Sequence, residues 1–165
     1  MSTTVEASHE YEHPIEKVIE VFRDPDFYLD KFEGVGARKV EVLSSSDEDG
    51  VFTIETQREV PLEVPSALKA FLGAWTTVLQ NEEWVEGEDG EYLNALEINS
   101  EGLPAVITGS MTLTPTDEGC VNEVVMEIDC AIPLIGRKLE RFVADSTEEQ
   151  LEAEYEFIQE YLDGL

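Results

Sequence analysis

Polar and apolar residues alternate at the start of the chain. Residues 3–12 place His9 and Tyr11 on one face together with Val5 and Ala7, and mostly acidic side chains on the other. This period of two is typical of a strand with one buried face. Two short segments with helical apolar spacing follow, the first opened by a proline suited to a first helical turn. The pattern predicts a strand and then two short helices, at residues 3–12, 14–23 and 27–32.

Six further strands are predicted, and short polar turns that contain glycine separate most of them. A short amphipathic helix at residues 66–75 interrupts the series, and a polar turn is expected at residues 44–50. In the last strand Met126 shares one face with other apolar residues, while acidic residues occupy the opposite face. The six strands are expected at residues 37–44, 51–60, 76–86, 91–99, 105–115 and 120–132.

A long amphipathic helix is predicted at residues 134–163. Its apolar positions, which include Phe142 and Tyr155, fall on one stripe with acidic residues opposite. About 30 residues at about 1.5 Å per residue give a helix near 45 Å long, enough to cross a sheet. Because consecutive antiparallel strands bury one face, this helix is the element that can cover it. We therefore expect one α+β domain over residues 1–165 with a helix-grip fold: a seven-stranded, curved antiparallel sheet wrapped on a long C-terminal helix, with two short helices after the first strand.

The chain carries 38 acidic and 10 basic residues, a formal net charge of −28. A surface this negative repels phosphate backbones and anionic lipid headgroups, which argues against nucleic-acid and membrane-surface partners. The acidic residues are spread over the whole chain, as in a solvated coat at high salt, so a salt-adapted bacterial source is expected. The sequence has no secretory signal pattern and no apolar stretch of about 20 residues. We therefore expect a cytoplasmic protein without membrane insertion.

The residue types that carry covalent or metal chemistry are few. Cys120 and Cys130 share one predicted strand at a separation of about 33 Å, so we expect them to be reduced, buried and unreactive. His13 precedes a proline at a helix start, and a structural role is expected. No HExxH, CxxC, glycine-rich phosphate loop or GxSxG motif occurs. The residues themselves indicate no metal site, no cofactor and no catalytic residue.

Two segments resemble a known superfamily. The opening YEHPIEKVIEVFRDPDFY has the order strand, proline, helix with valine, then Asp-Pro. The segment IPLIGRKLERFVADSTEEQLEAEYEFIQEYL places Gly136, Leu139 and Glu140 in a Gly-x-x-Leu-Glu arrangement. Over its full length the chain is similar to START-like, SRPBCC (polyketide cyclase/Bet v 1-type) domains, and to their uncharacterised bacterial DUF2505 branch. The resemblance implies a cavity under the C-terminal helix, but it fixes no function, because the superfamily includes lipid carriers, cyclases and chaperone partners.

Ten residues are candidates to line this cavity. His9 could act there as a general base or bind a polar ligand group, although a hydrogen-bonded core histidine is the commoner alternative. The aromatic residues could line a pocket for a flat or apolar ligand or form ordinary core, and the sequence does not separate the two. The candidates are His9, Tyr11, Phe32, Arg58, Phe71, Trp84, Met126, Phe142, Val143 and Tyr155.

Arg58 and a cluster of basic residues each allow two interpretations. Arg58 has the parity of the inward-facing Phe52 and Ile54, and an inward guanidinium near an acidic side chain could anchor a ligand carboxylate. Because long cationic side chains usually extend toward solvent, we expect Arg58 to reach the rim instead. We expect the only basic cluster to pair with neighbouring acidic residues; it consists of Arg137, Lys138 and Arg141.

Three functions fit these expectations. The favoured one is non-catalytic binding of a small hydrophobic molecule (a lipid, an isoprenoid or an aromatic polyketide-like compound) by a carrier or sensor. A polyketide cyclase or dehydratase would instead need two convergent titratable groups with perturbed pKa values in the pocket. A protein-interaction module would have a filled core and an exposed apolar patch. Each of these functions is compatible with a homodimer.

Overall fold

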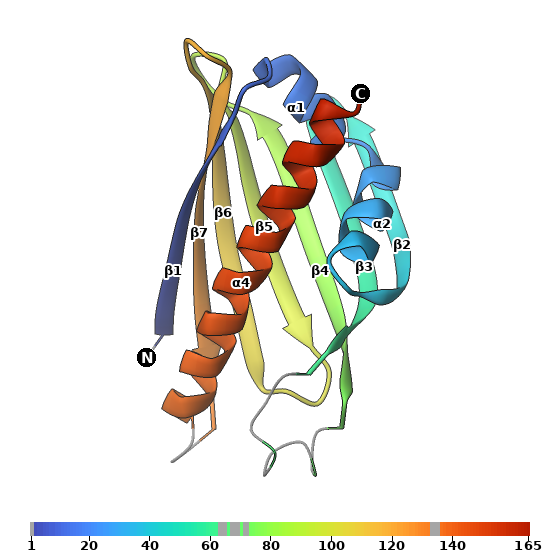
Figure 1. The fold of residues 1–165 in the computed structure, drawn as a ribbon, viewed down its shortest axis with the longest axis vertical. Helices are drawn as coiled ribbons and strands as arrows, with labels where there is room; N and C mark the ends of the chain where they lie inside the picture. Colours follow the sequence, from blue (N-terminus) through green and yellow to red (C-terminus); the bar gives the residue numbers. More distant parts are fainter. Residues whose placement is uncertain (1, 63–65, 67–69, 71–72, 133–135) are drawn as a thin grey trace.

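The computed structural model describes residues 2–62, 66, 70, 73–132 and 136–165. Within these ranges the chain forms a strand, two short helices, six strands and a long final helix (Figure 1). The elements are β1 (Ser2–Tyr11), α1 (Ile15–Phe22), α2 (Pro25–Gly34), β2 (Arg38–Glu48), β3 (Val51–Pro61), β4 (Trp75–Glu86), β5 (Tyr92–Ser100), β6 (Ala105–Pro115), β7 (Cys120–Cys130) and α4 (Gly136–Asp163).

The described strands form one antiparallel sheet of seven, in the order β1-β7-β6-β5-β4-β3-β2. Strands β2 to β7 are a meander in which each strand pairs with the next, and β1 pairs with β7 at the far edge. The register places His9 opposite Asn122 and Arg58 opposite Val78. The predicted seven-stranded antiparallel sheet is confirmed.

Strand β2 is longer than the sequence pattern predicted. The expected polar turn at residues 44–50 is wrong, because β2 continues to Glu48 and only two residues connect it to β3. Asp49 and Gly50 have φ angles of 54° and 79°, as a two-residue hairpin turn of the type with two positive φ angles requires. Because β2 is an exposed edge strand, its serines face water and their polarity does not indicate a loop.

The short helix predicted at residues 66–75 lies mainly outside the described residues. Its last expected residue, Trp75, is instead the first residue of β4, where it pairs with Pro61 of β3. Strand β7 stops at Cys130, two residues earlier than expected.

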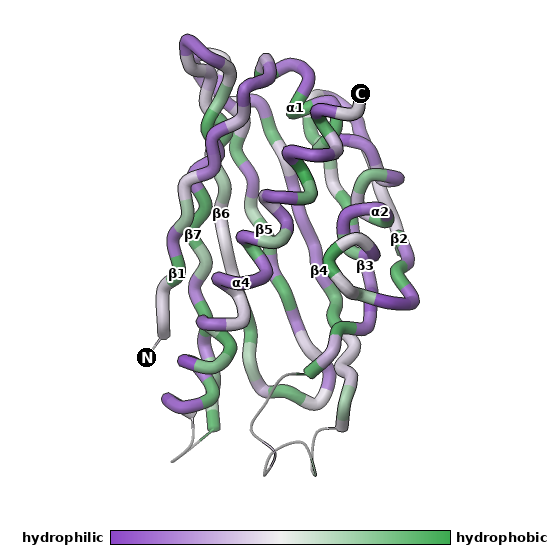
Figure 2. Tube along the Cα trace, viewed as in Figure 1, coloured by the Kyte–Doolittle hydropathy of each residue, from purple (hydrophilic) through white to green (hydrophobic). Residues whose placement is uncertain are grey.

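Helix α4 lies across one face of the sheet, and it runs from near the N-terminus of the chain to α1 (Figure 1). It contacts β1, β7 and α2. Hydrophilic residues dominate its trace, and hydrophobic residues interrupt them at intervals (Figure 2). Its buried apolar residues recur at the spacing that keeps them on one side of a helix. They are Leu139, Ala144, Leu151, Ile158 and Leu162. The predicted helix-grip layout is confirmed.

Side-chain size differs between the two halves of the core. Around α1, α2 and the C-terminal half of α4 the core is aromatic, and Phe22 stacks on Trp84 with ring centroids 5.5 Å apart. Under the N-terminal half of α4 the core is aliphatic, with Leu96, Met126 and Leu151 among its members. Large rings fill the first half, whereas smaller side chains leave space in the second.

Candidate ligand cavity

A cavity of about 350 Å³ lies between the sheet and the N-terminal half of α4. Alternate residues of a strand face the same side, and strands β3 to β7 each contribute inward side chains to this space. Most of the wall is apolar, as in sites for small molecules. The apolar residues of the wall include Val60, Leu62, Val78, Ile98, Leu103, Ile107, Met111, Met126, Phe142, Val143 and Leu151.

Arg58 of β3 is a charged residue in this wall. The expectation that it reaches the rim is wrong, because only 5% of its surface is exposed; the side chain has the inward position that strand parity allowed. Its Cζ atom lies 3.9 Å from the centroid of the Phe32 ring. Among the residues that the structure describes, its Nε and Nη1 atoms have no hydrogen-bond partner. Burial lowers the pKa of Arg58 to about 10, against the opposing charges of Glu154 and Glu82, so the guanidinium is charged at neutral pH.

Lys31 of α2 and Glu154 of α4 form an ion pair in the same wall. The Lys31 Nζ and Glu154 Oε1 atoms are 3.2 Å apart, and the two side chains are 8% and 17% exposed. The ammonium also lies 4.6 Å from the centroid of Phe32 and 4.8 Å from that of Tyr28. The pair therefore connects α2 to α4 beside the cavity, and the Glu154 carboxylate already has a cationic partner in Lys31.

Glu82 of β4 belongs to a second buried polar group. The side chain is 6% exposed, and its two carboxylate oxygens accept hydrogen bonds from Gln80 Nε2 at 2.8 Å and Asn94 Nδ2 at 3.1 Å. Gln80 also lines the cavity. Residues 80, 82 and 84 share the inward parity of β4, so this polar group is placed by strand alternation.

His9 and Tyr155 lie in an adjoining and much smaller space of about 30 Å³, with Tyr11 and Trp84, and Lys31 and Glu154 line both spaces. Their rings stack with centroids 4.3 Å apart, and Tyr155 Oη donates a hydrogen bond to the Glu10 carbonyl oxygen at 2.7 Å. Burial lowers the pKa of His9, against the attraction of nearby carboxylates. A space of this size is suited to about one water molecule, so His9 and Trp84 are packed core, whereas Tyr11 and Tyr155 also line a polar groove between β1 and the end of α4.

The ten sequence candidates are thus divided by the structure. Phe32 is fully buried and its ring contacts the Arg58 guanidinium, and Phe71 lies outside the described residues. The others fall in two groups. Arg58, Met126, Phe142 and Val143 line the larger cavity, and His9, Tyr11, Trp84 and Tyr155 line the small space.

Sequence reasoning missed the polar residues of the larger cavity other than Arg58, among them Gln80, Lys31 and Glu154. The sequence contained a signal for Gln80, because Gln80 has the same strand parity as Val78 and Trp84 on β4. Lys31 and Glu154 carried none: both are charged residues in amphipathic helices, and their burial depends on how α2 packs against α4.

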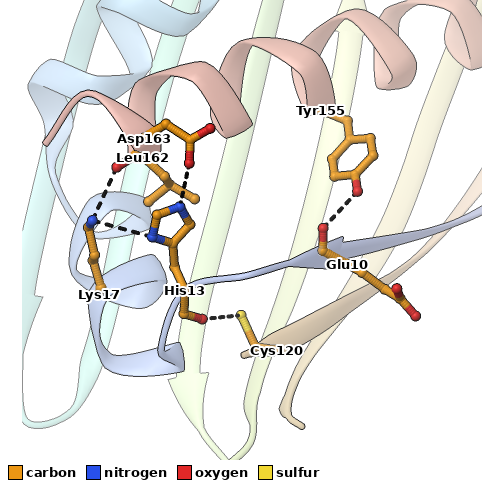
Figure 3. Close-up of polar contacts among 7 residues, drawn as sticks. All are labelled: Glu10, His13, Lys17, Cys120, Tyr155, Leu162 and Asp163. Carbon is orange, nitrogen blue, oxygen red and sulfur yellow. Dashed lines mark hydrogen bonds and ion pairs between the residues drawn. The ribbon is translucent and has the colours of Figure 1, made fainter. Parts of the chain in front are cut away.

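A polar groove of about 570 Å³ lies where β1 meets α1. There His13 Nε2 lies 2.8 Å from Asp163 Oδ1, and Lys17 Nζ donates a hydrogen bond to the Leu162 carbonyl oxygen at 3.1 Å (Figure 3). These contacts join the end of α4 to the start of α1, so His13 has a structural position. Burial raises the pKa of the neighbouring Cys120 to about 11, which leaves its thiol protonated and poorly nucleophilic at neutral pH.

Three further features concern the described residues as a set. Both cysteines are free and buried, at opposite ends of β7, as predicted. In the part of the chain that the structure covers, no three His, Cys, Asp or Glu side chains are grouped to hold a metal ion. No described helix is long and apolar enough to cross a membrane.

Solved structures share this fold at low sequence identity. The TTHA0849 protein from Thermus thermophilus superposes with a TM-score of 0.65 at 17% identity, covering 99% of this chain and 98% of that protein. Ara h 8.0201 gives 0.63 at 13% identity, with full coverage of both chains. A STAR-related lipid transfer protein from Xanthomonas axonopodis gives 0.60 at 15% identity, covering 96% and 85%. At these identities the likeness shows the fold, and it confirms the START-like resemblance.

Sequence comparison assigns the family. No curated protein matches the chain. The family model described as "Protein of unknown function (DUF2505)" matches residues 6–162, which is nearly the whole sequence. The chain therefore belongs to the DUF2505 family and has the START-like helix-grip fold.

Proposed function

We propose that this protein binds a small, predominantly apolar molecule in the cavity between the sheet and α4, as a non-catalytic carrier or sensor in the cytoplasm. The observation that carries the proposal is the 350 Å³ space itself, whose wall is mostly aliphatic. A protein-interaction module would have filled that space. The buried free thiols of Cys120 and Cys130 fit a reducing compartment.

Burial of apolar surface supplies the affinity in this proposal. Each methylene group that moves from water into such a wall gains about 0.8 kcal/mol. The translational and rotational entropy that the ligand loses on binding offsets part of this free energy. A molecule of about ten carbons therefore reaches micromolar affinity only if most of its length is enclosed. One structural neighbour is named as a lipid transfer protein, which is consistent with this use of the fold.

The enzyme alternative has weaker support. It requires two convergent titratable groups prepared for proton transfer. Lys31 and Glu154 are held in an ion pair, and His9, which lines the small space together with that pair, is stacked on Tyr155. The cavity wall therefore offers polar groups suited to orienting a ligand.

Binding of the neutral dye N-phenyl-1-naphthylamine tests the proposal. We expect its fluorescence to rise on titration with wild-type protein. Ile107→Trp places a large ring inside the cavity and should weaken dye binding at least about tenfold. Val106→Trp is the matched control, because Val106 is the adjacent residue of β6 on the opposite, exposed face.

Either of two results would contradict the proposal. One is a wild-type protein that does not bind the dye or any compound of an apolar library. The other is equal dye binding by the two tryptophan variants, with both shown to be folded by circular dichroism. Native mass spectrometry of protein purified directly from cells would then identify the class of a resident ligand.

A further inference from the structure

Arg58 is an unusual residue for the wall of an apolar cavity. It is a cation with 5% of its surface exposed, and it stands on the inward face of β3 between Phe52 and Ile54 on one side and Val60 on the other. Buried charges are normally paired, because an unpaired one loses its hydration without compensation. In the described structure no carboxylate lies within ion-pair distance of its nitrogens, and two of its three nitrogens have no hydrogen-bond acceptor.

The carboxylates near Arg58 are already occupied. Glu154 pairs with Lys31 at 3.2 Å, and Glu82 accepts amide hydrogen bonds from Gln80 and Asn94. Both attract the guanidinium over a longer distance, but neither contacts it. The hydrogen-bonding capacity of Arg58 is therefore directed elsewhere.

Two of the three guanidinium nitrogens, Nε and Nη1, are fully buried as well as unpaired among the described residues, so Nη2 is the nitrogen that an acceptor in the cavity can reach. The Phe32 ring covers the group at 3.9 Å, and a ring face cannot accept the in-plane N–H bonds of a guanidinium. Arg58 itself lines the 350 Å³ space, with Lys31 and Gln80 as its polar neighbours in the wall. The strand side of the wall beyond these residues is mostly aliphatic, and the side formed by α4 also carries polar residues, including Glu149, Gln150 and Glu154.

We propose that the ligand carries a carboxylate group that Arg58 receives through charge-assisted hydrogen bonds, while its apolar part lies along β4 to β7 under α4. This inference rests on the proposed function and names the class of ligand: an apolar monocarboxylic acid. The lowered pKa of Arg58, about 10, leaves the guanidinium protonated throughout the neutral range, as the contact requires.

The local charges select a single negative charge. One uncompensated cation is available, and two carboxylates, Glu82 and Glu154, lie near enough to influence it. A phosphate with two negative charges would be repelled by both. A neutral alcohol would offer a single acceptor atom and would leave the buried cation without a counter-charge. A carboxylate supplies one charge and two acceptor atoms.

Isothermal titration of two probes of equal chain length tests this inference. Dodecanoate carries the carboxylate, and dodecan-1-ol has the same apolar chain without charge. Wild-type protein should bind dodecanoate about 10–100-fold more tightly than the alcohol, the range expected for hydrogen bonds to a charged group. Arg58→Met should remove this preference and leave the affinity for dodecan-1-ol within about twofold.

Two additional variants separate charge from folding defects. Arg58→Lys keeps a cation and should retain part of the preference for the acid. Arg38→Met is the matched control, because Arg38 is an exposed arginine of the neighbouring strand β2 that pairs with Glu59 outside the cavity. It should bind both probes as the wild-type protein does. The comparison of the two probes on the wild-type protein needs no variant at all.

The outcomes distinguish this inference from the proposed function. Equal affinities of the wild-type protein for acid and alcohol, with clear binding of both, would overturn the carboxylate inference and leave the apolar-binding function intact. An acid preference that Arg58→Met and Arg38→Met both retain would also overturn it, because the anion would then be held elsewhere. Failure of both probes and of N-phenyl-1-naphthylamine to bind would overturn the proposed function and this inference together.

Discussion

Replacing Arg58 with methionine is expected to stabilise the ligand-free protein. An exposed arginine titrates above about 12, whereas burial lowers the pKa of Arg58 to about 10. At about 1.4 kcal/mol per pKa unit, this difference corresponds to roughly 3 kcal/mol of unfavourable free energy for the charged side chain in the folded state. Methionine keeps a flexible apolar chain of similar length and removes the charge.

The lost contact with Phe32 offsets part of this gain. A guanidinium 3.9 Å from a ring centroid contributes about 1 kcal/mol. The free energy of unfolding of Arg58→Met should therefore exceed that of the wild-type protein by about 2 kcal/mol. Most single substitutions of a buried residue act in the opposite direction, which makes the sign of the change informative.

Urea unfolding followed by circular dichroism measures this difference. The protein should first be unfolded and refolded to release any resident ligand, because a ligand bound to the native state adds to its apparent stability. Arg38→Met, which loses an exposed ion pair and a ring contact with Trp75, should be no more stable than wild type. A loss of more than about 1 kcal/mol in Arg58→Met would refute the reasoning, since it would show that the guanidinium is compensated in the ligand-free protein.

Three other changes have defined outcomes in the same urea assay. Gly119→Ala should cost about 3 kcal/mol, because its Cβ would overlap the carbonyl oxygen at the end of β1, while Gly164→Ala meets only ordinary contacts; equal stability of the two would contradict this. Between pH 7.5 and 5.5 the free energy of unfolding of His9→Gln should fall less than that of the wild-type protein. Because the pKa of His9 is lowered in the folded state, the unfolded chain binds the proton first, and wild-type stability falls as the pH drops below about 6.5. Equal losses in the two proteins would exclude this. Lys31→Met should cost about 3 kcal/mol by leaving Glu154 unpaired, and a cost below about 1 kcal/mol would show the pair to be dispensable.

The fold could be predicted from periodicity because each element buries one face. The period of two in β1 and β7 and the helical stripe of α4 both arise from contact with the same core. The prediction was wrong at β2, where the strand is an exposed edge and its serines give no alternating pattern. A strand without a buried face carries little periodic signal, so its length was set by pairing with β3.

The candidate site could be predicted only in part. Strand parity placed Arg58 and Met126 on the inner face, and the structure puts both in the cavity wall. Parity did not predict how deeply Arg58 is buried, because its burial depends on Phe32 of α2, which packs over the guanidinium. The Lys31–Glu154 pair joins residues 123 positions apart in the chain, so no local pattern could indicate it.

The position of Arg58 explains why affinity and selectivity would come from different residues. Toward Phe52 and Ile54, β3 packs into the aromatic half of the core, and toward Val60 it lines the cavity. The guanidinium therefore stands at the inner boundary of the open space, where an acidic head group would enter first and the apolar chain would extend along Ile107 and Met126. An apolar molecule without an acid would fill the same space but leave the buried cation unpaired. The aliphatic wall would thus set how tightly any apolar molecule binds, and Arg58 would set which of them is preferred.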